Sequence, residues 1–139
     1  DKLKALFLIE QALSLTDLDW NLVQTALNYL DLTVVMSSNL NPTVSLARVQ
    51  LPLISFAETD GTYTNYAGRV QRLFPALPPK GESKPGWKIF VELAGSLGKE
   101  LPYNNAEEVF SSLAEEAPAY KDLNYEKIGD QGAMLTNYA

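Results

Sequence analysis

The first 36 residues combine two apolar runs with a segment that has the apolar spacing of a helix. Residues 3–9 are apolar apart from one lysine, which is typical of a strand buried on both faces of a parallel sheet. Apolar residues then recur after Thr16 and Asp17 along one helix face, which predicts a helix capped by Asp or Thr. These apolar residues are Trp20, Leu22, Val23, Leu27 and Leu30. A β-branched run at 33–36 completes a βαβ pattern, so the two strands should be parallel, with a right-handed crossover.

The middle of the chain is rich in residues that interrupt regular structure. Pro42 permits a short helix to start near Thr43, and residues 49–54 form another extended segment that Pro52 confines to a strand end or a sheet edge. Residues 58–72 are rich in Gly, Thr, Asn and Tyr, which predicts a long structured loop. The prolines and glycines that follow, up to Gly86, predict an irregular connector.

Two further helices and a tail complete the pattern. Helical spacing resumes at 87–97 and stops at Gly98, and a second helix is predicted at 106–116 after the capping residue Asn105. The tail from residue 120 has little periodicity and three tyrosines. We expect it to be a loop that packs on the domain or on neighbours missing from this sequence.

Together these elements predict an α/β fold: a small parallel sheet with flanking helices, then a long Gly/Pro-rich loop and two C-terminal helices. Within residues 1–139 we expect a βαβ core at 1–56, a loop and connector at 57–86, helices at 87–117 and a tail at 118–139. The charged start at Asp1, without an initiator Met, favours a single segment excised from a longer chain.

Composition excludes several kinds of site. Seventeen acidic residues against eleven basic ones give a net charge of -6, the wrong sign for binding nucleic acid or an anionic membrane. The chain has no Cys and no His, so it cannot supply the usual ligands of iron–sulfur clusters and structural zinc or the base of a Ser-His-Asp triad. We therefore expect no catalytic residue and no metal site in this segment.

The densest polar cluster lies between residues 58 and 71, and it allows two interpretations. The carboxylates of Glu58 and Asp60 could act as acid and base or bind a hard cation. Alternatively, Asp60 and Gly61 form a turn, Glu58 pairs with Arg69 or caps backbone amides, and Thr and Asn side chains satisfy the loop backbone. The structural interpretation needs no ligand, and we favour it.

An ordered string of motifs in residues 43–98 resembles the closing part of a molybdopterin-oxidoreductase domain. That superfamily includes formate dehydrogenases, nitrate reductases and the large iron–sulfur subunit of NADH-quinone oxidoreductase, respiratory complex I. The matching positions are Thr43, Leu51-Pro52, Phe56-Ala57-Glu58-Thr59-Asp60-Gly61-Thr62-Tyr63-Thr64-Asn65, Gly68-Arg69-Val70-Gln71, Pro78-Pro79-Lys80-Gly81-Glu82 and Pro85-Gly86-Trp87-Lys88-Ile89.

The chain departs from the molybdenum enzymes where the resemblance implies cofactor contacts. Their Gly-Glu-Asn-Pro-like turn is replaced by Glu10-Gln11-Ala12, and Ser37 stands where a cofactor-contacting Asp is expected. These departures favour a cofactor-free structural domain of the large iron–sulfur subunit of complex I, supporting electron transfer from NADH to quinone. The resemblance then implies clusters elsewhere in the parent subunit and other complex I subunits as partners. It also implies a peripheral position on the cytoplasmic side of the bacterial inner membrane, without direct membrane insertion.

The alternative within the same superfamily is a fragment of a molybdenum bis-pterin-guanine-dinucleotide oxidoreductase, of the formate dehydrogenase or nitrate reductase type. In that case the resemblance implies that Thr62, Asn65 and Arg69 contact the dinucleotide. A third possibility is a free-standing interaction module that uses the same fold. The altered turn at residues 10–12 distinguishes the first two interpretations.

Overall fold

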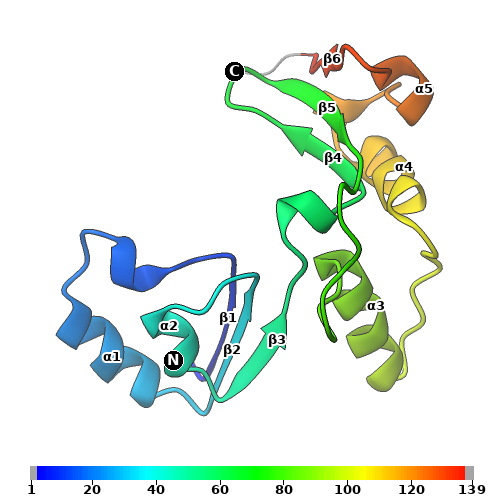
Figure 1. Ribbon diagram of the computed structural model, residues 1–139. Coiled ribbons are helices and arrows are strands. Elements are labelled where there is room, and N and C mark those ends of the chain that lie inside the picture. Colours follow the sequence, from blue (N-terminus) through cyan, green and yellow to red (C-terminus); the bar gives the residue numbers. More distant parts are fainter. Residues whose placement is uncertain (1–2, 137–139) are drawn as a thin grey trace. The chain divides into compact units, whose positions relative to one another are not determined.

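The chain forms two compact units, each built from two separate stretches of sequence. The computed structural model describes residues 3–136. Unit 1 comprises Asp1–Ser55 and Pro79–Gly86, and unit 2 comprises Phe56–Pro78 and Trp87–Ala139. Figure 1 labels the elements of both units. No helix within residues 3–136 is long and apolar enough to cross a membrane.

Unit 1 contains a three-stranded parallel sheet, as the βαβ pattern predicts. Its strands are β1 (Ala5–Ile9), β2 (Leu32–Ser37) and β3 (Val49–Pro52), in the order β1-β2-β3. The register pairs Ile9 with Met36 and Met36 with Leu51. The central strand β2 is buried on both faces, which explains its continuous apolar sequence. Pro52 ends the edge strand β3, where its missing N–H costs no ladder bond.

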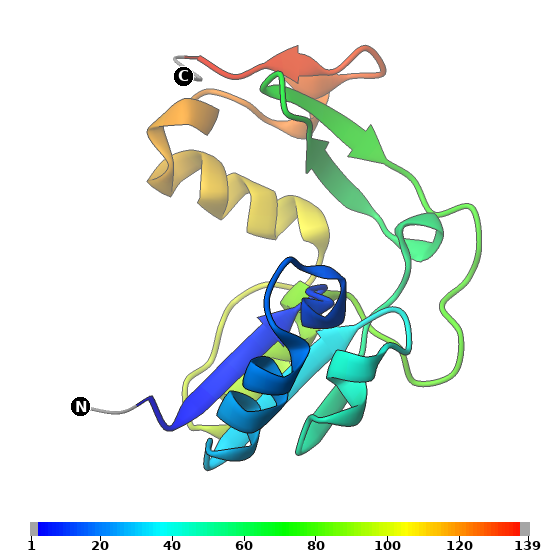
Figure 2. The same cartoon turned by 90° about the vertical axis from the view of Figure 1, so that its left-hand side faces the viewer.

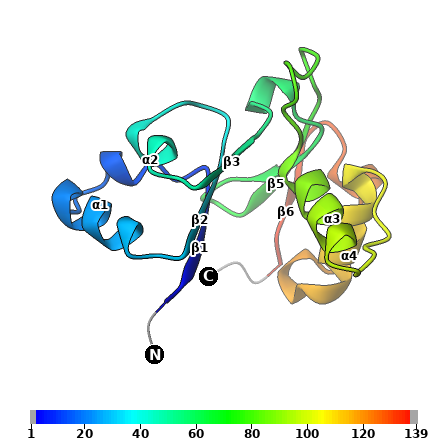
Figure 3. The same cartoon turned by 90° about the horizontal axis from the view of Figure 1, so that it is seen from below.

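The helices of unit 1 are the 3₁₀ turn η1 (Leu13–Leu15), α1 (Trp20–Asn28) and α2 (Pro42–Ser45). Both α-helices lie on the same face of the sheet (Figure 3). The cap of α1 is Asp19, whose carboxylate accepts from the Asn21 amide at 2.9 Å. The predicted candidate Thr16 instead donates to the Leu13 carbonyl, because it closes the preceding 3₁₀ turn.

Unit 2 contains an antiparallel sheet that the sequence interpretation placed within a loop. Its strands are β4 (Gly61–Thr64), β5 (Arg69–Leu73) and β6 (Ala133–Met134), in the order β4-β5-β6. Residues 58–72 therefore hold a hairpin, preceded by the 3₁₀ turn η2 (Phe56–Glu58). The hairpin forms because alternate residues face a core, in which Val70 is fully buried.

The helices of unit 2 confirm the predictions for 87–97 and 106–116 almost residue by residue. They are α3 (Gly86–Ser96), α4 (Ala106–Glu116), the 3₁₀ turn η3 (Pro118–Tyr120) and α5 (Tyr125–Ile128). Helix α4 runs along one side of the β4–β5 hairpin (Figure 2). The core of unit 2 consists of Val70, Phe110, Tyr125, Ile128 and Leu135.

The tail is more regular than the predicted loop, because it completes both the core and the sheet of unit 2. Tyr125 and Ile128 of α5 enter the core, and β6 pairs with β5. The Leu135 amide then donates to the Gly68 carbonyl at 2.8 Å. Of the three tyrosines expected to pack there, Tyr138 lies outside the described residues.

Candidate functional site

The carboxyl ends of β1 and β2 form the first place to look for a site. In open α/β sheets, ligands bind at the carboxyl ends of the strands, where amides of the following turns are available. Because Ile9 is paired with Met36, the turn after β1 and the turn after β2 lie side by side. The residues that follow the two strands are Glu10 and Ser38.

Glu10 connects these two turns. Its amide donates to the Met36 carbonyl at 2.8 Å, which extends the parallel ladder by one bond. Its Oε1 accepts from the Ser38 amide at 2.7 Å, and its Oε2 accepts from the Ser38 hydroxyl at 3.2 Å. Glu10 has a φ of 52°, a left-handed conformation that costs a non-glycine residue about 1–2 kcal/mol. The turn thus has a backbone conformation that suits glycine while carrying a carboxylate.

Other amides at this edge also have acceptors within the chain. The Asn39 amide donates to the Ser37 hydroxyl oxygen at 3.3 Å. The first two amides of α2 donate to the Asn41 side chain, at 3.0 Å from Thr43 and 3.2 Å from Val44. Ser37, where the resemblance implies a ligand-contacting Asp, is therefore part of a self-contained turn.

The β4–β5 hairpin carries the three residues assigned to dinucleotide contact. Thr62 is paired with Arg72, on the same face of the hairpin as the buried Val70. Asn65 and Arg69 face each other at the turn, where the Asn65 amide donates to the Arg69 carbonyl at 3.0 Å. By strand alternation, this pair lies on the opposite face from Thr62. The structure therefore brings Asn65 and Arg69 together and places Thr62 apart from them.

The polar atoms of Asn65 and Arg69 support the hairpin itself. Asn65 Oδ1 accepts from the amides of Ala67 and Arg69, each at 3.0 Å, as the structural interpretation of the polar cluster predicts. The Arg69 guanidinium donates through Nη1 to the Gln131 carbonyl at 3.0 Å, which joins β5 to the tail. Both residues thus have a structural role that needs no ligand.

Of the two carboxylates in the polar cluster, Asp60 takes part in a contact of the kind that the favoured structural interpretation describes. Asp60 forms an ion pair with Arg72 at 3.5 Å. Within residues 3–136, no three Asp, Glu, His or Cys side chains are grouped so that they could hold a metal ion.

Arg72 and Tyr125 form a contact that the sequence interpretation missed. The Arg72 guanidinium carbon lies 3.4 Å from the centre of the Tyr125 ring and 4.9 Å from that of Phe74, so a cation is stacked on aromatic faces. Burial raises the pKa of the Tyr125 phenol, and the positive charge of Arg72 opposes that shift. No local signal indicates this pair, since its members are far apart in the sequence.

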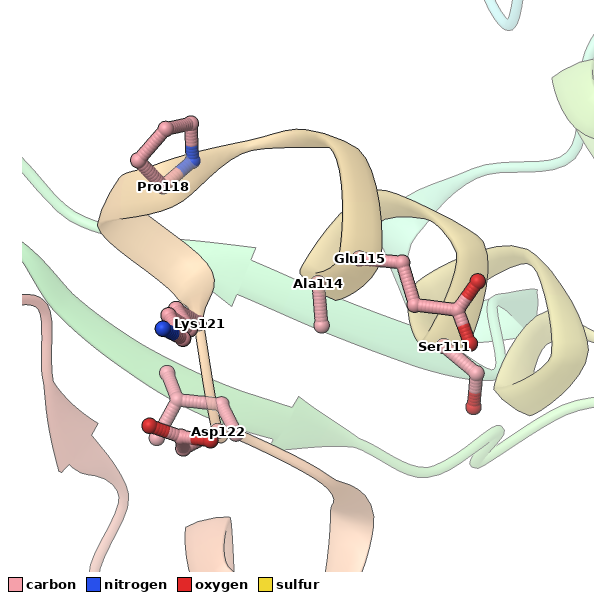
Figure 4. Close-up of a pocket in the computed structure, with 7 residues that line it drawn as sticks. Ser111, Ala114, Glu115, Pro118, Lys121 and Asp122 are labelled. Atoms are coloured by element: carbon pink, nitrogen blue, oxygen red, sulfur yellow. The ribbon is translucent and has the colours of Figure 1, made fainter.

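The hollows of unit 2 do not coincide with the Asn65–Arg69 pair. One of about 710 Å³ lies beside α4, η3 and the following loop (Figure 4). Ser111 and Glu115 border it from α4, and Lys121 and Asp122 from the loop. A smaller hollow of about 220 Å³ is lined by Thr62, Trp87 and Phe110, among others. Of the three residues predicted to bind cofactor, Thr62 alone borders one of these two hollows.

Comparison with protein-family models gives a match to the "Molybdopterin oxidoreductase" family over residues 1–96, more than half of the chain. The chain belongs to this family. A Bacillus subtilis protein named "Putative formate dehydrogenase YrhE" is 39% identical over 134 residues, covering 96% of this chain and 14% of the relative. A Staphylococcus aureus protein, also named "Putative formate dehydrogenase", is 39% identical over 127 residues, covering 91% of this chain and 13% of the relative.

The fold of this family member also matches a solved structure. Acetylene hydratase from Pelobacter acetylenicus superimposes with a TM-score of 0.75 over 96% of this chain and 18% of that protein, at 20% sequence identity. That likeness concerns the fold alone. The chain spans about one seventh of the length of its curated relatives. Their names agree with the formate dehydrogenase alternative and give no support to the complex I assignment.

Proposed function

We propose that this chain is a structural segment of a formate-dehydrogenase-type oxidoreductase. The observation that supports the proposal is the 39% identity to "Putative formate dehydrogenase YrhE" across 96% of the chain. Because the chain corresponds to only 14% of that relative, we assign any activity to the parent polypeptide. The partners of this segment would then be the other domains of the parent, which would also carry any iron–sulfur clusters.

The pterin dinucleotide that the family implies does not fit the polar groups of this segment well. At the sheet edge, the carboxylate of Glu10 accepts the hydrogen bonds that a phosphate would need. At the hairpin, Thr62 lies on a different face from Asn65 and Arg69, so the three do not form one binding surface. We therefore assign no reaction step to these residues. Their proposed contribution is to hold the fold beside the parent's cofactor-bearing parts.

The test is purification of the parent polypeptide from its source organism, followed by assay of formate-dependent dye reduction together with iron, molybdenum, tungsten and pterin. We expect formate oxidation, with metal and pterin present in proportion to protein. Iron without molybdenum, tungsten or pterin, and without formate oxidation, would contradict the proposal.

A second candidate is the cofactor-free lobe of the large iron–sulfur subunit of NADH-quinone oxidoreductase, favoured by the Glu10 turn alone. In that case the parent would be peripheral to the cytoplasmic side of the bacterial inner membrane and would bind neighbouring complex I subunits. NADH-dependent quinone reduction by a complex that contains the parent, with iron as its metal, would support this candidate over the first.

A further inference from the structure

We propose that Glu10 closes the carboxyl edge of the β1–β2–β3 sheet to phosphate, so that the parent protein holds no dinucleotide through this edge. The inference rests on the proposed function for the class of ligand, a guanine dinucleotide. It concerns one residue and one edge of unit 1. The inference about Glu10 is compatible with formate oxidation by the parent if the parent binds a dinucleotide elsewhere.

The first argument is the occupation of hydrogen-bond donors. A phosphate at a strand end is held by backbone amides and hydroxyls of the following turns. Here the amide and the hydroxyl of Ser38 both donate to the two carboxylate oxygens of Glu10, at 2.7 and 3.2 Å. The carboxylate therefore occupies the donors that an anionic ligand would use after β2.

The second argument is charge. A carboxylate between the ends of β1 and β2 repels a phosphate placed at the same edge, and the repulsion adds to the loss of donors. The turn after β2 contributes no compensating cation. Its residues Ser37, Asn39 and Asn41 are neutral and form hydrogen bonds with one another.

The third argument is backbone conformation. Glu10 has a φ of 52°, which glycine adopts without steric cost. A glycine here would keep the turn, remove the charge and free both Ser38 donors. The left-handed backbone conformation at residue 10 is thus compatible with phosphate binding at this edge. The side chain of Glu10 alone prevents that binding.

The experiment compares the full-length parent with its Glu10→Gly and Glu10→Gln variants. Binding of guanosine diphosphate is measured by equilibrium dialysis, and the pterin content of each purified protein by the fluorescence of its oxidised derivative. We expect the unaltered parent to bind guanosine diphosphate weakly, because any pterin dinucleotide that it carries is held outside this edge. Glu10→Gly should bind at least ten times more tightly and carry more pterin, and Glu10→Gln should show a smaller gain because it removes the charge alone.

Asp122→Gly is the matched control, since Asp122 is the other described non-glycine residue with positive φ, at 65°. This change also removes a carboxylate and relieves the same kind of backbone strain, but it lies in unit 2. It should change neither nucleotide binding nor pterin content.

Two results would overturn the inference. One is nucleotide binding by the unaltered parent as tight as that of Glu10→Gly, and the other is a folded Glu10→Gly variant that gains neither nucleotide nor pterin. The formate assay is read separately. A parent that oxidises formate while Glu10→Gly gains nothing would leave the proposed function standing and refute the role of Glu10.

Discussion

At the scale of single residues, the surroundings of Gly132 leave no room for a side chain. A Cβ at this position would lie 2.6 Å from the Val70 carbonyl oxygen and 2.9 Å from Gln71 Cγ, and Gly132 has a φ of 72°. Gly132→Ala should therefore lower the free energy of unfolding by more than about 2 kcal/mol, because a left-handed conformation and a backbone clash act together.

Gly95→Ala provides the control within the same unit. Gly95 lies in α3 with nothing within 4 Å of its added Cβ, so alanine should stabilise the protein by about 0.5–1 kcal/mol. Both variants are compared by urea unfolding in a Trp20→Phe background, followed by the fluorescence of Trp87. Equal effects of the two substitutions would contradict the packing described around Gly132.

Tyr125 combines a well-packed ring with an unpaired hydroxyl. The ring contacts Phe110 and Arg72, whereas the buried hydroxyl has no hydrogen-bond partner among residues 3–136. Tyr125→Phe keeps the contacts of the ring with Phe110 and Arg72 and removes the unpaired oxygen. Its free energy of unfolding at pH 7 should be unchanged or about 1 kcal/mol higher. Tyr125→Ala, the control that removes the ring, should cost about 3–5 kcal/mol.

The raised pKa of Tyr125 adds a dependence on pH. A phenol whose pKa is higher in the folded state contributes stability below its unfolded pKa of about 10 and loses it as pH rises toward the folded value. Unfolding measured from pH 8 to about pH 11 should show a steeper decline for the unaltered protein than for Tyr125→Phe. Parallel declines would argue against a buried phenol.

At the scale of elements, the start of α4 is fixed by reciprocal hydrogen bonds. Asn105 Oδ1 accepts from the Glu108 amide at 2.9 Å, while Glu108 Oε2 accepts from the Asn104 amide at 2.7 Å. The bond from the Asn104 amide has the largest effect and lowers the pKa of Glu108. Desolvation opposes it, and the side chains of Asn104 and Asn105 lower that pKa further.

A lowered pKa means that Glu108 stabilises the folded state above its ordinary pKa and stops doing so as pH falls through the folded value. Glu108→Gln should therefore reduce stability at pH 7 and show a weaker loss of stability between pH 5 and about pH 3. The control is Glu107→Gln in the same turn, and urea midpoints across this range are the measurement. An unaltered pH profile in Glu108→Gln would refute the cap.

Elements with a clear apolar pattern in their own sequence, such as α4, β1 and β2, were predicted, whereas the strands β4, β5 and β6 were not. Helix α4 matches its prediction because Asn105 and the apolar spacing lie within the helix's own sequence. The strand β6 was missed because it exists only through pairing of Ala133 with Val70. Likewise, the resemblance identified the altered turn at residues 10–12, but the bond from Glu10 to Ser38 depends on the parallel register of β1 and β2.

At the scale of the whole molecule, each unit has its own core and one tryptophan. Trp20 packs against the cluster of Val23, Leu27 and Leu30 in unit 1, and Trp87 lines the same hollow as Phe110 in unit 2. Leu27→Ala and Ile128→Ala should each cost about 2–5 kcal/mol in their own unit. The measurement uses two backgrounds, each with one tryptophan replaced by phenylalanine, so that the remaining tryptophan reports on its own unit. Each alanine substitution should shift the urea midpoint reported by the tryptophan of the same unit more than the midpoint reported by the tryptophan of the other unit. Equal shifts would show a single cooperative transition.

The two units alternate along the sequence, and this order has a consequence for protein synthesis. The second stretch of unit 1 is joined to the first through Lys84, whose amide donates to the Pro52 carbonyl at 3.2 Å and whose carbonyl accepts from the Ile54 amide at 3.1 Å. When Lys84 leaves the ribosome, the β4–β5 hairpin has already emerged, but β6 follows β5 by roughly 60 residues. At about 5–20 residues per second, the β5 edge waits roughly 3–12 s for its third strand. During that interval a nascent chain exposes Val70 and an unpaired strand edge, which is when chaperone protection would matter most.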